Sequence, residues 1–308
     1  MMSKIAIILG YYNGEEFLNE LLNSIFKQSY QSFHIFLFDD NSPEVLNLES
    51  LNLSKENRER ITIHRREKNI GFANNFLNAL KKVDMFFDFY AFCDQDDIWM
   101  TDKLARAIGK INQENTNLPL IYGTKTLHID KTGKSIIGES INISKELSFK
   151  NALIQSFAGG NTMVFNHKAK ELIVSSLRDI SPASHDWWAY ILITGNGGKV
   201  IYDSEYSLFY RQHDKNSMGS NKTLSGKFKR LFKIFNNEFQ NYINHNLEAL
   251  HLNSDLLTLE NYNIMRDFSK ARKYNFFKKS LYYLSSGLYR QNYSGSFFFF
   301  IFFIIGKI

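Results

Sequence analysis

The sequence predicts an α/β fold in which a mainly parallel sheet is flanked by helices, with a helical C-terminal extension. First, short apolar segments alternate with amphipathic segments between residues 4 and 129, an order typical of Rossmann-like sheets covered on both faces. Second, polar clusters follow the apolar segments, at the strand ends where ligands bind in such folds. Third, the chain becomes basic and aromatic near residue 220, which divides it into regions 1–220 and 221–308.

The individual elements are predicted from two patterns: short apolar runs indicate strands, and apolar residues at helical spacing indicate helices. Residues 4–10, KIAIILG, form an isoleucine-rich run that is too short for a typical helix and predicts a strand. Residues 15–28 have apolar side chains at helical spacing and predict a helix. The same patterns predict strands at 32–40, 60–66, 88–94 and 118–129, and helices at 72–83 and 101–112.

The order of elements becomes mixed from about residue 145. Glycines in AGGNTMVFN, residues 158–166, indicate a turn that leads into a short strand. The other predicted elements are helices near 147–156 and 167–177, a helix that begins near 185, a strand at 199–203, and a strand at 207–216 that runs into a polar loop.

Composition limits the class of protein. Of 308 residues, 44% are hydrophobic, so a large core is expected. The net charge of +6 favours an anionic partner, such as a nucleotide, a membrane surface or a nucleic acid. The one cysteine, Cys93, has no intramolecular partner for a disulfide and fits a reducing compartment. No apolar run reaches the roughly 18 residues of a spanning helix, and the N-terminus indicates a strand rather than a signal peptide.

The segment DQDD places Asp94, Asp96 and Asp97 at the end of a predicted buried strand. An arbitrary acidic turn is usually solvated and caps a helix. At a strand end, however, Asp94 and Asp96 offer a pair of carboxylates to Mg²⁺ or Mn²⁺, ions that also take phosphate oxygens as ligands. A second cluster, FDDNS at 38–42, is either an ordinary Asx turn or a site for a ribose or base.

Seven segments give the chain a family resemblance, and they occur in the family's order over residues 1–220. They are GYYNGEEFL (10–18), SIFKQSYQSFHIFLFDDNS (24–42), NIGFANNF (69–76), FCDQDDIWMTDKL (92–104), AGGNTMVFN (158–166), HDWW (185–188) and YRQHDKNSMG (210–219). With these, the chain resembles the family 2 glycosyltransferases, which have a GT-A fold. DQDDIW together with HDWW resembles a bacterial rhamnosyltransferase-like group that makes polysaccharide and O-antigen.

The resemblance implies roles for individual residues. Asp94 and Asp96 match the DxD metal motif, and His213 matches a histidine that reaches the metal or the diphosphate. Asp186 matches the catalytic base of inverting members. Residues implied in binding the nucleotide sugar are Tyr12, Glu15, Asp40, Gly71, Asn74, Asp94, Gly160 and Arg211. Gly10 is a departure, because relatives often have Ser or Thr there, and a side-chain contact to the base is lost.

The chemistry of the residues agrees with these roles. An acceptor hydroxyl loses a proton as it attacks the sugar, and Asp186 is a suitable base if it lies on the face away from the diphosphate. The alternative for SHDWW is a helix N-terminus capped by Ser184 or Asp186, with the tryptophans in the core. Trp187 and Trp188 are otherwise candidates for acceptor binding, by stacking on a sugar. A glycine turn at Gly160 and a satisfied loop histidine at His213 are the corresponding structural alternatives.

The C-terminal region has an excess of positive charge. Residues 222–290 contain twelve basic and five acidic residues. Residues 225–235 predict a helix with phenylalanines on one face, and Phe297 to Ile305 form an apolar run too short to span a bilayer. These segments are expected either to pack on the catalytic domain or in a homodimer, or to contact a membrane surface peripherally.

The expected function is therefore metal-assisted, inverting transfer of a hexose or deoxyhexose, such as rhamnose. The donor is a nucleotide-diphosphate sugar, and the acceptor is a hydroxyl of a growing cell-surface glycan or lipid-linked glycan. The expected location is the cytoplasm, at the inner face of the cell membrane. The alternative is a nucleotide-sugar-binding protein without catalytic activity. Nucleic acid is not an expected partner, because the sequence has no signature of a nucleic-acid-binding module.

Overall fold

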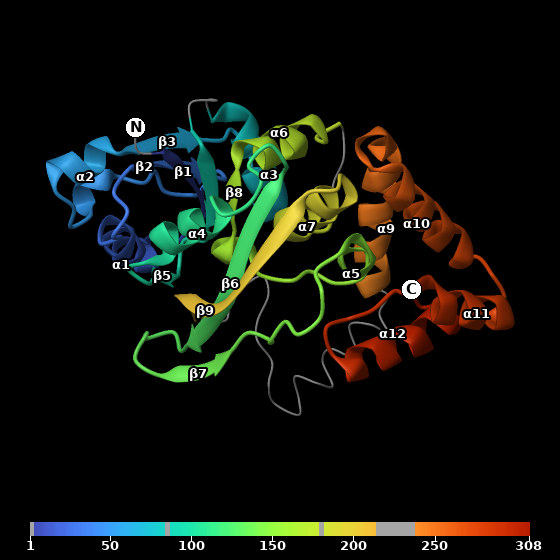
Figure 1. Ribbon diagram of the computed structural model, residues 1–308. Helices are drawn as coiled ribbons and strands as arrows, with labels where there is room; N and C mark the ends of the chain where they lie inside the picture. Colours follow the sequence, from blue (N-terminus) through green and yellow to red (C-terminus); the bar gives the residue numbers. More distant parts are fainter. Residues whose placement is uncertain (1–2, 84–86, 179–181, 214–237) are drawn as a thin grey trace.

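The computed structural model describes residues 3–83, 87–178, 182–213 and 238–308. Its centre is a twisted nine-stranded sheet with the order β3-β2-β1-β4-β8-β6-β9-β5, and β7 pairs with β6 beside this path. Helices cover both faces, and a group of C-terminal helices lies at one end (Figure 1). The predicted α/β architecture with a helical C-terminal region is confirmed.

Six of the nine strands in the described residues form where the sequence predicted them, whereas the short strands Ile98–Trp99 and Ile136–Glu139 were not predicted. The bounds of all nine are β1 Ile5–Tyr11, β2 Phe33–Asp39, β3 Ile61–Arg65, β4 Phe89–Cys93, β5 Ile98–Trp99, β6 Leu120–Ile129, β7 Ile136–Glu139, β8 Val164–Asn166 and β9 Lys199–Arg211. The first four strands are parallel to one another. The register pairs Tyr11 with Asp39 and Asp39 with Arg65, so the carboxyl ends of β1, β2 and β3 meet at one edge.

Amphipathic helices form the layers on either side. The helices of the first region are α1 Glu15–Phe26, α2 Lys55–Glu59, α3 Phe72–Lys82, α4 Lys103–Ile111, α5 Phe149–Ala152, α6 His167–Ser175 and α7 His185–Gly195. Successive residues of β1 face opposite sides of the sheet. Ile7 packs in one core with α1 and α4, and Ile8 packs in the other with α3, α6 and α7.

The sheet as a whole is mixed, although its first half is parallel as predicted. β8 is antiparallel to both β4 and β6, and β5 is antiparallel to β9. The two strands predicted at 199–203 and 207–216 are one strand, β9. The polar residues between them stay within the strand, where its pairing with β6 shifts register instead of ending. The predicted helix at 147–156 is shorter, because α5 ends at Ala152.

The C-terminal helices share a core with the first region. They are α9 Glu238–Leu252, α10 Leu259–Ala271, α11 Phe276–Ser286 and α12 Tyr293–Ile304. Leu250, Phe268 and Phe303 belong to the same buried cluster as Trp188. One face of the aromatic tail is therefore buried in the core, which agrees with the expectation that the tail packs on the catalytic domain. The predicted boundary at 220 and the predicted helix at 225–235 lie outside the described residues. No helix in the described part of the chain is long and apolar enough to cross a membrane.

Candidate active site

A pocket of about 540 Å³ lies at the carboxyl edge of the parallel strands. The ends of β1, β2, β4 and β9 contribute to its lining, together with the first turn of α3. Six of the residues proposed from the sequence line it: Tyr12, Asp40, Gly71, Asp94, Asp96 and His213. The polar strand ends therefore come together as the parallel topology predicts.

The loop after β1 forms one wall and is tied to the acidic loop after β4. The Tyr12 N–H donates to Oε1 of Gln95 at 2.7 Å, and Nε2 of Gln95 donates to the Tyr12 carbonyl at 3.1 Å. A Cβ on Gly14 would lie 2.2 Å from Cδ of Gln95, so only glycine leaves room for this side chain. Gln95 thus fixes two pocket loops against each other.

Gly10 leaves space for an aromatic ring. A Cβ at this position would lie 2.7 Å from Cζ of Phe76, which is buried and also lines the pocket. A Ser or Thr, as the resemblance leads one to expect here, would collide with that ring. The departure at Gly10 is therefore matched by Phe76, which fills the vacated space.

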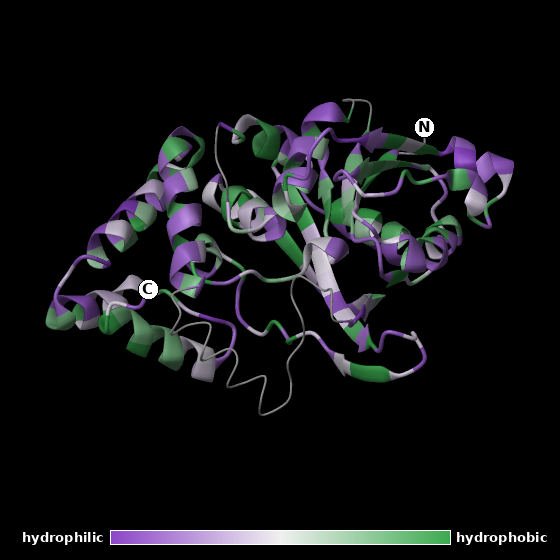
Figure 2. Cartoon of the chain, turned by 180° about the vertical axis from the view of Figure 1, so that it is seen from behind, coloured by the Kyte–Doolittle hydropathy of each residue, from purple (hydrophilic) through white to green (hydrophobic). Residues whose placement is uncertain are grey.

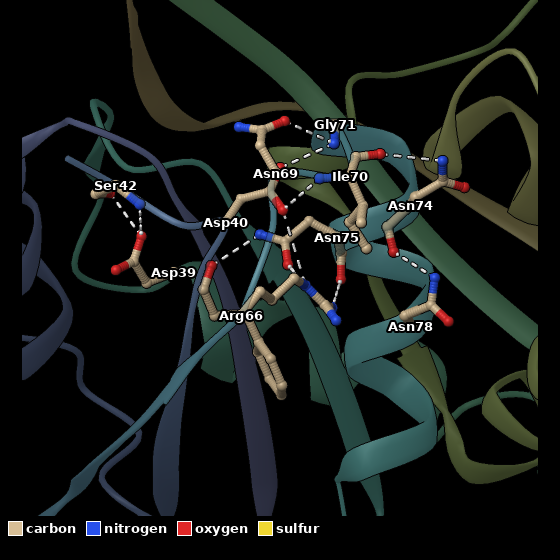
Figure 3. A network of polar contacts seen from close by, with 11 residues as sticks. Asp39, Asp40, Ser42, Arg66, Asn69, Ile70, Gly71, Asn74, Asn75 and Asn78 are labelled. Atoms are coloured by element: carbon tan, nitrogen blue, oxygen red, sulfur yellow. Dashed lines mark hydrogen bonds and ion pairs between the residues drawn. The ribbon is translucent and has the colours of Figure 1, made fainter.

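The two aspartates of the FDDNS segment have different hydrogen-bond partners (Figure 3). Oδ1 of Asp39 accepts from the N–H and the hydroxyl of Ser42, at 2.8 and 2.5 Å, which is the turn expected at a strand end. The two oxygens of Asp40 accept from the N–H groups of Ile70 and Gly71, each at 2.9 Å. Asp40 therefore holds the loop that begins α3 and at the same time borders the pocket.

The beginning of α3 depends on a special backbone conformation. Gly71 precedes the helix with φ of 81°, a conformation that other residues rarely adopt. Nδ2 of Asn74 donates to the Ile70 carbonyl at 3.1 Å, and Asn74 does not line the pocket. Asn75 lines it instead, and its Oδ1 accepts from Nε of Arg66 at 2.6 Å. The amide next in sequence therefore occupies the place that was predicted for Asn74.

The acidic loop brings the carboxyl groups of Asp94 and Asp96 to the pocket. Burial, followed by the nearby carboxylates of Asp96 and Asp186, raises the pKa of Asp94 to about 7. Oδ2 of Asp96 lies 2.8 Å from Nε2 of His213, and the His213 ring stacks on Phe17 at 5.1 Å. Asp96 and His213, two of the three proposed metal ligands, are therefore in direct contact.

Asp97 does not face the pocket but belongs to a buried network behind it. Its side chain is fully buried, and burial together with Asp96 and Asp94 raises its pKa well above the usual range. Nδ2 of Asn161 donates to Oδ2 of Asp97 at 2.6 Å, and Nζ of the buried Lys103 donates to the Asn161 carbonyl. Burial lowers the pKa of Lys103 to about 8. The network connects the acidic loop to the segment that precedes β8.

Asp186 lies in the first turn of α7, next to the segment that contains Gly160. The hydroxyl of Ser184 accepts from the Trp187 N–H, so Ser184 is the N-cap of the helix. Oδ1 of Asp186 accepts from the Ser184 hydroxyl at 2.5 Å and from the Trp187 N–H at 2.7 Å. Oδ2 accepts from the Gly160 N–H at 3.2 Å. Capping and a fixed carboxylate therefore occur together in this segment.

The pocket itself is lined by His185 rather than by Asp186. The His185 ring stacks on Phe76 with centroids 4.1 Å apart, and a Cβ on Gly160 would lie 2.3 Å from its Nε2. Burial lowers the pKa of His185 to about 4, so the ring is neutral near pH 7. Gly160 thus has two functions visible here, a close approach to an imidazole and an N–H that orients Asp186.

Three of the proposed binding residues, Trp187, Trp188 and Arg211, do not line the pocket. Trp187 and Trp188 are buried in the core, where Trp187 Nε1 donates to the Ala152 carbonyl at 2.6 Å and Trp188 Nε1 donates to the Ser176 hydroxyl at 3.0 Å. Both side chains are buried and neither lines the pocket, so stacking on an acceptor stays a prediction that this arrangement does not support. Arg211 is also buried, and its guanidinium donates to the carbonyls of Asp96 and Lys131 and to the Glu20 carboxylate. Arg211 supports the acidic loop and does not line the pocket.

Glu15 is likewise outside the pocket lining, whereas Glu16 is part of it. The Ser50 hydroxyl donates to Oε1 of Glu15 at 3.5 Å, and burial, followed by the Glu15 carboxylate, raises the pKa of Tyr11. The two glutamates occupy consecutive helical positions, which point about 100° apart. Sequence alone gave no reason to prefer the second.

The side chains fit a divalent cation only in part. Among the described residues, no group of three or more His, Cys, Asp or Glu side chains could hold a metal ion. When two ligand atoms each lie about 2.1 Å from an ion, and the angle between them at the ion is a right angle, the two atoms are about 3 Å apart. The 2.8 Å between Asp96 Oδ2 and His213 Nε2 is close to that spacing, but here it is the length of a hydrogen bond between the two side chains. The pair therefore fits an ion only if this hydrogen bond is replaced and water or phosphate oxygens complete the shell.

Sequence comparisons place the chain among sugar transferases. The model of Glycosyl transferase family 2 matches residues 6–173. The dTDP-rhamnosyl transferase RfbG of Shigella flexneri is 28% identical over 78% of this chain and 83% of its own length. The UDP-Glc:alpha-D-GlcNAc-diphosphoundecaprenol beta-1,3-glucosyltransferase WfgD of Escherichia coli is 28% identical over 46% of this chain and 54% of its own length.

Solved structures show the same fold. TarS 1–349 of S. aureus in complex with UDP-GlcNAc superposes with a TM-score of 0.55 at 17% identity, over 98% of this chain and 81% of that one. The mannosyltransferase PcManGT from Pyrobaculum calidifontis, in complex with GDP-Man and Mn²⁺, gives 0.51 at 12% identity, over 100% of this chain and 86% of its own. At these identities the likeness concerns the fold alone.

Proposed function

The chain belongs to glycosyl transferase family 2 and has the GT-A fold, and from this premise we propose an inverting transfer from a nucleoside-diphosphate sugar. The observation that carries the proposal is the position of Asp96, His213 and Asp94 at one pocket, with Asp186 held close enough to raise the Asp94 pKa. We assign catalysis to region 1–220 and a supporting role to region 221–308.

The donor occupies the pocket at the ends of β1, β2 and β4. Tyr12, Asp40 and Gly71 border the part of the pocket next to the loop after β1 and the first turn of α3, where the nucleoside is placed. Because RfbG is named a dTDP-rhamnosyl transferase, a nucleotide-linked deoxyhexose such as dTDP-rhamnose is the first donor to test. UDP-linked hexoses are the second, after the name of WfgD.

Asp96 and His213 are the residues that would hold Mg²⁺ or Mn²⁺, with the Asp94 carboxyl beside them. A cation bound there would supply positive charge to the leaving diphosphate. Without a cation, Asp94 resists ionisation, as its pKa of about 7 shows. A positive ion beside the Asp94 carboxyl would favour its charged form. The residues of the acidic loop thus bind the leaving group rather than react with the sugar.

Asp186 accepts the proton of the acceptor hydroxyl. Three hydrogen bonds, from Ser184, Trp187 and Gly160, hold its carboxylate in one orientation. A fixed carboxylate beside the reacting carbon removes the need to order it during attack. Attack from the side opposite the diphosphate inverts the anomeric centre.

The acceptor is a hydroxyl of a growing glycan, free or linked to lipid. We place the enzyme in the cytoplasm at the inner face of the membrane, where the C-terminal region makes a peripheral contact. The function is tested with a panel of dTDP-rhamnose, UDP-glucose, UDP-galactose and UDP-GlcNAc, each with Mn²⁺ and a lipid-linked acceptor. Transfer of one sugar with inversion supports the proposal. Donor binding with neither transfer nor hydrolysis for any donor favours the alternative, an inactive nucleotide-sugar-binding protein.

A further inference from the structure

The two last helices have apolar side chains on their outward faces. On α11, Phe276, Phe277, Leu281 and Leu284 are between 53% and 77% exposed. At 100° per residue these four positions lie within one side of the helix. Lys279 is buried, and the rings of Tyr282 and Tyr283 pack against the core, Tyr283 on Phe299 of α12. The helix therefore presents apolar side chains to solvent as well as to the core.

The outward face of α12 is also apolar. Tyr293, Phe297 and Phe298, with Ile305 just after the helix, are between 48% and 85% exposed. Phe299, Phe302 and Phe303 are buried on the other side. No charged residue occurs within Tyr293–Ile304. These four exposed residues and the four on α11 are called the terminal apolar face below.

The terminal apolar face lies away from the catalytic edge of the sheet. Figures 1 and 2 both show α11 and α12 side by side at the end of the molecule opposite β3. Their apolar residues give the ribbon its green colour there in Figure 2. A surface of this kind is rarely left in water by a soluble protein, so a binding partner is expected.

The charge of the C-terminal helices distinguishes between two partners, a second copy of the chain and an anionic lipid surface. Residues 268–308 include seven basic residues and no acidic residue. Lys270, Lys273 and Lys278 are exposed around the beginning of α11. A second copy of the chain would bring these cations against an equal set, which is unfavourable. An anionic lipid surface instead attracts lysines and accepts aromatic side chains at the depth of its headgroups.

We propose that the terminal apolar face is a docking surface for an anionic lipid bilayer. Phe277 and Leu281 insert into the interface, and the exposed lysines remain at the level of the headgroups. The terminal apolar face is the surface that makes the membrane contact of the proposed function. The proposal rests on that function in one respect only, namely that membrane binding brings a lipid-linked acceptor within reach. Binding itself requires neither donor nor acceptor.

The test is co-sedimentation of the full chain with vesicles of phosphatidylcholine, with and without phosphatidylglycerol. The wild type is expected to bind the vesicles that contain phosphatidylglycerol and to be released by salt. Phe277→Ser with Leu281→Ser is expected to weaken binding about tenfold or more, because two large apolar groups no longer insert. Lys273→Gln with Lys278→Gln is expected to weaken it about fivefold for each lysine.

Val45→Ser with Ile136→Ser is the matched control, since both side chains are exposed and apolar but lie on other elements. Thermal unfolding and nucleotide binding check that each variant is folded. Equal vesicle binding by the wild type and the Phe277/Leu281 variant overturns the proposal. So does a wild-type dimer that the same substitutions dissociate, if the wild type ignores vesicles. Vesicle binding without sugar transfer leaves this proposal standing and overturns only the proposed function.

Discussion

Nε2 of His213 lies 2.8 Å from Oδ2 of Asp96, although the two residues are 117 positions apart in the chain. Asp96 follows β4, and His213 follows β9, which reaches the same edge of the sheet. Arg211 stabilises this meeting by donating from Nε to the Asp96 carbonyl at 3.0 Å. The first prediction follows from this pair.

Asp96→Asn is expected to abolish the effect of metal on donor binding while the fold stays intact, because a neutral amide is a poor ligand for Mg²⁺ or Mn²⁺. Calorimetry with dTDP and UDP, in Mn²⁺ and in chelator, measures the effect. Asp102→Asn is the control, since that carboxylate is on the same segment but 59% exposed and paired with Arg106. Equal affinity with and without metal in the wild type would contradict the metal assignment.

Asp186→Asn is expected to lower turnover about a hundredfold or more, the scale of a lost general base. Donor affinity should change little, because Asp186 does not line the donor pocket. Single-turnover kinetics with a saturating donor separate the two quantities. Near-normal turnover in this variant would mean that another group takes the proton.

Trp188→Ala is expected to destabilise the fold by about 3–5 kcal/mol, because it leaves a cavity in the core and removes the partner of Ser176. Chemical denaturation measures the change in the free energy of unfolding. Trp188→Phe keeps most of the volume and is expected to cost less. If Trp188→Phe leaves stability unchanged but raises the KM for the acceptor, the indole contacts the acceptor after all.

Gly10→Ser is expected to destabilise the fold by about 1–3 kcal/mol, since the new Cβ would lie 2.7 Å from the Phe76 ring. Combining it with Phe76→Leu should recover part of the loss. Gly109→Ser is the control, because a Cβ at that position has no neighbouring atom within 4 Å. Additive losses in the double variant would show that the two positions do not compete for space.

His185→Gln is expected to make stability less sensitive to acid. The pKa of His185 is about 4 in the fold and 6.5 ordinarily, so the unfolded chain binds this proton first and stability is lost as pH falls from about 6.5 to about 4. The loss is on the order of 3 kcal/mol. Asp94 acts in the opposite direction below pH 7, because its raised pKa favours the folded state in acid. The difference between variant and wild type isolates His185, and parallel stability profiles would exclude the effect.

The sequence by itself determined the parallel strands of the first half of the sheet and the edge at which the site lies. Apolar runs end at Tyr11, Asp39 and Cys93, and parallel pairing brings such ends together. Asp40, Asp94 and Asp96 were therefore predictable as neighbours of one pocket, since strand order and direction follow from a local pattern and a general rule of topology.

The tertiary structure decided which side chain of each polar cluster faces the pocket. Glu16 lines it rather than Glu15, Asn75 rather than Asn74, and His185 rather than Asp186. Neighbouring helical residues point about 100° apart, so the choice depends on how each helix is rotated against the sheet. That rotation is fixed by packing with distant residues, which the local pattern does not contain.

Long-range contacts also decided the roles of Trp188 and Arg211. Their residue types suited a sugar and a diphosphate equally well, but Ser176 and the Asp96 carbonyl are their actual partners. Gln95 and Phe76 were missed for the same reason, because their importance comes from Gly14 and Gly10 across the pocket. A sequence shows which groups are available to bond, and the fold selects the partners because burial leaves each polar group only those within reach.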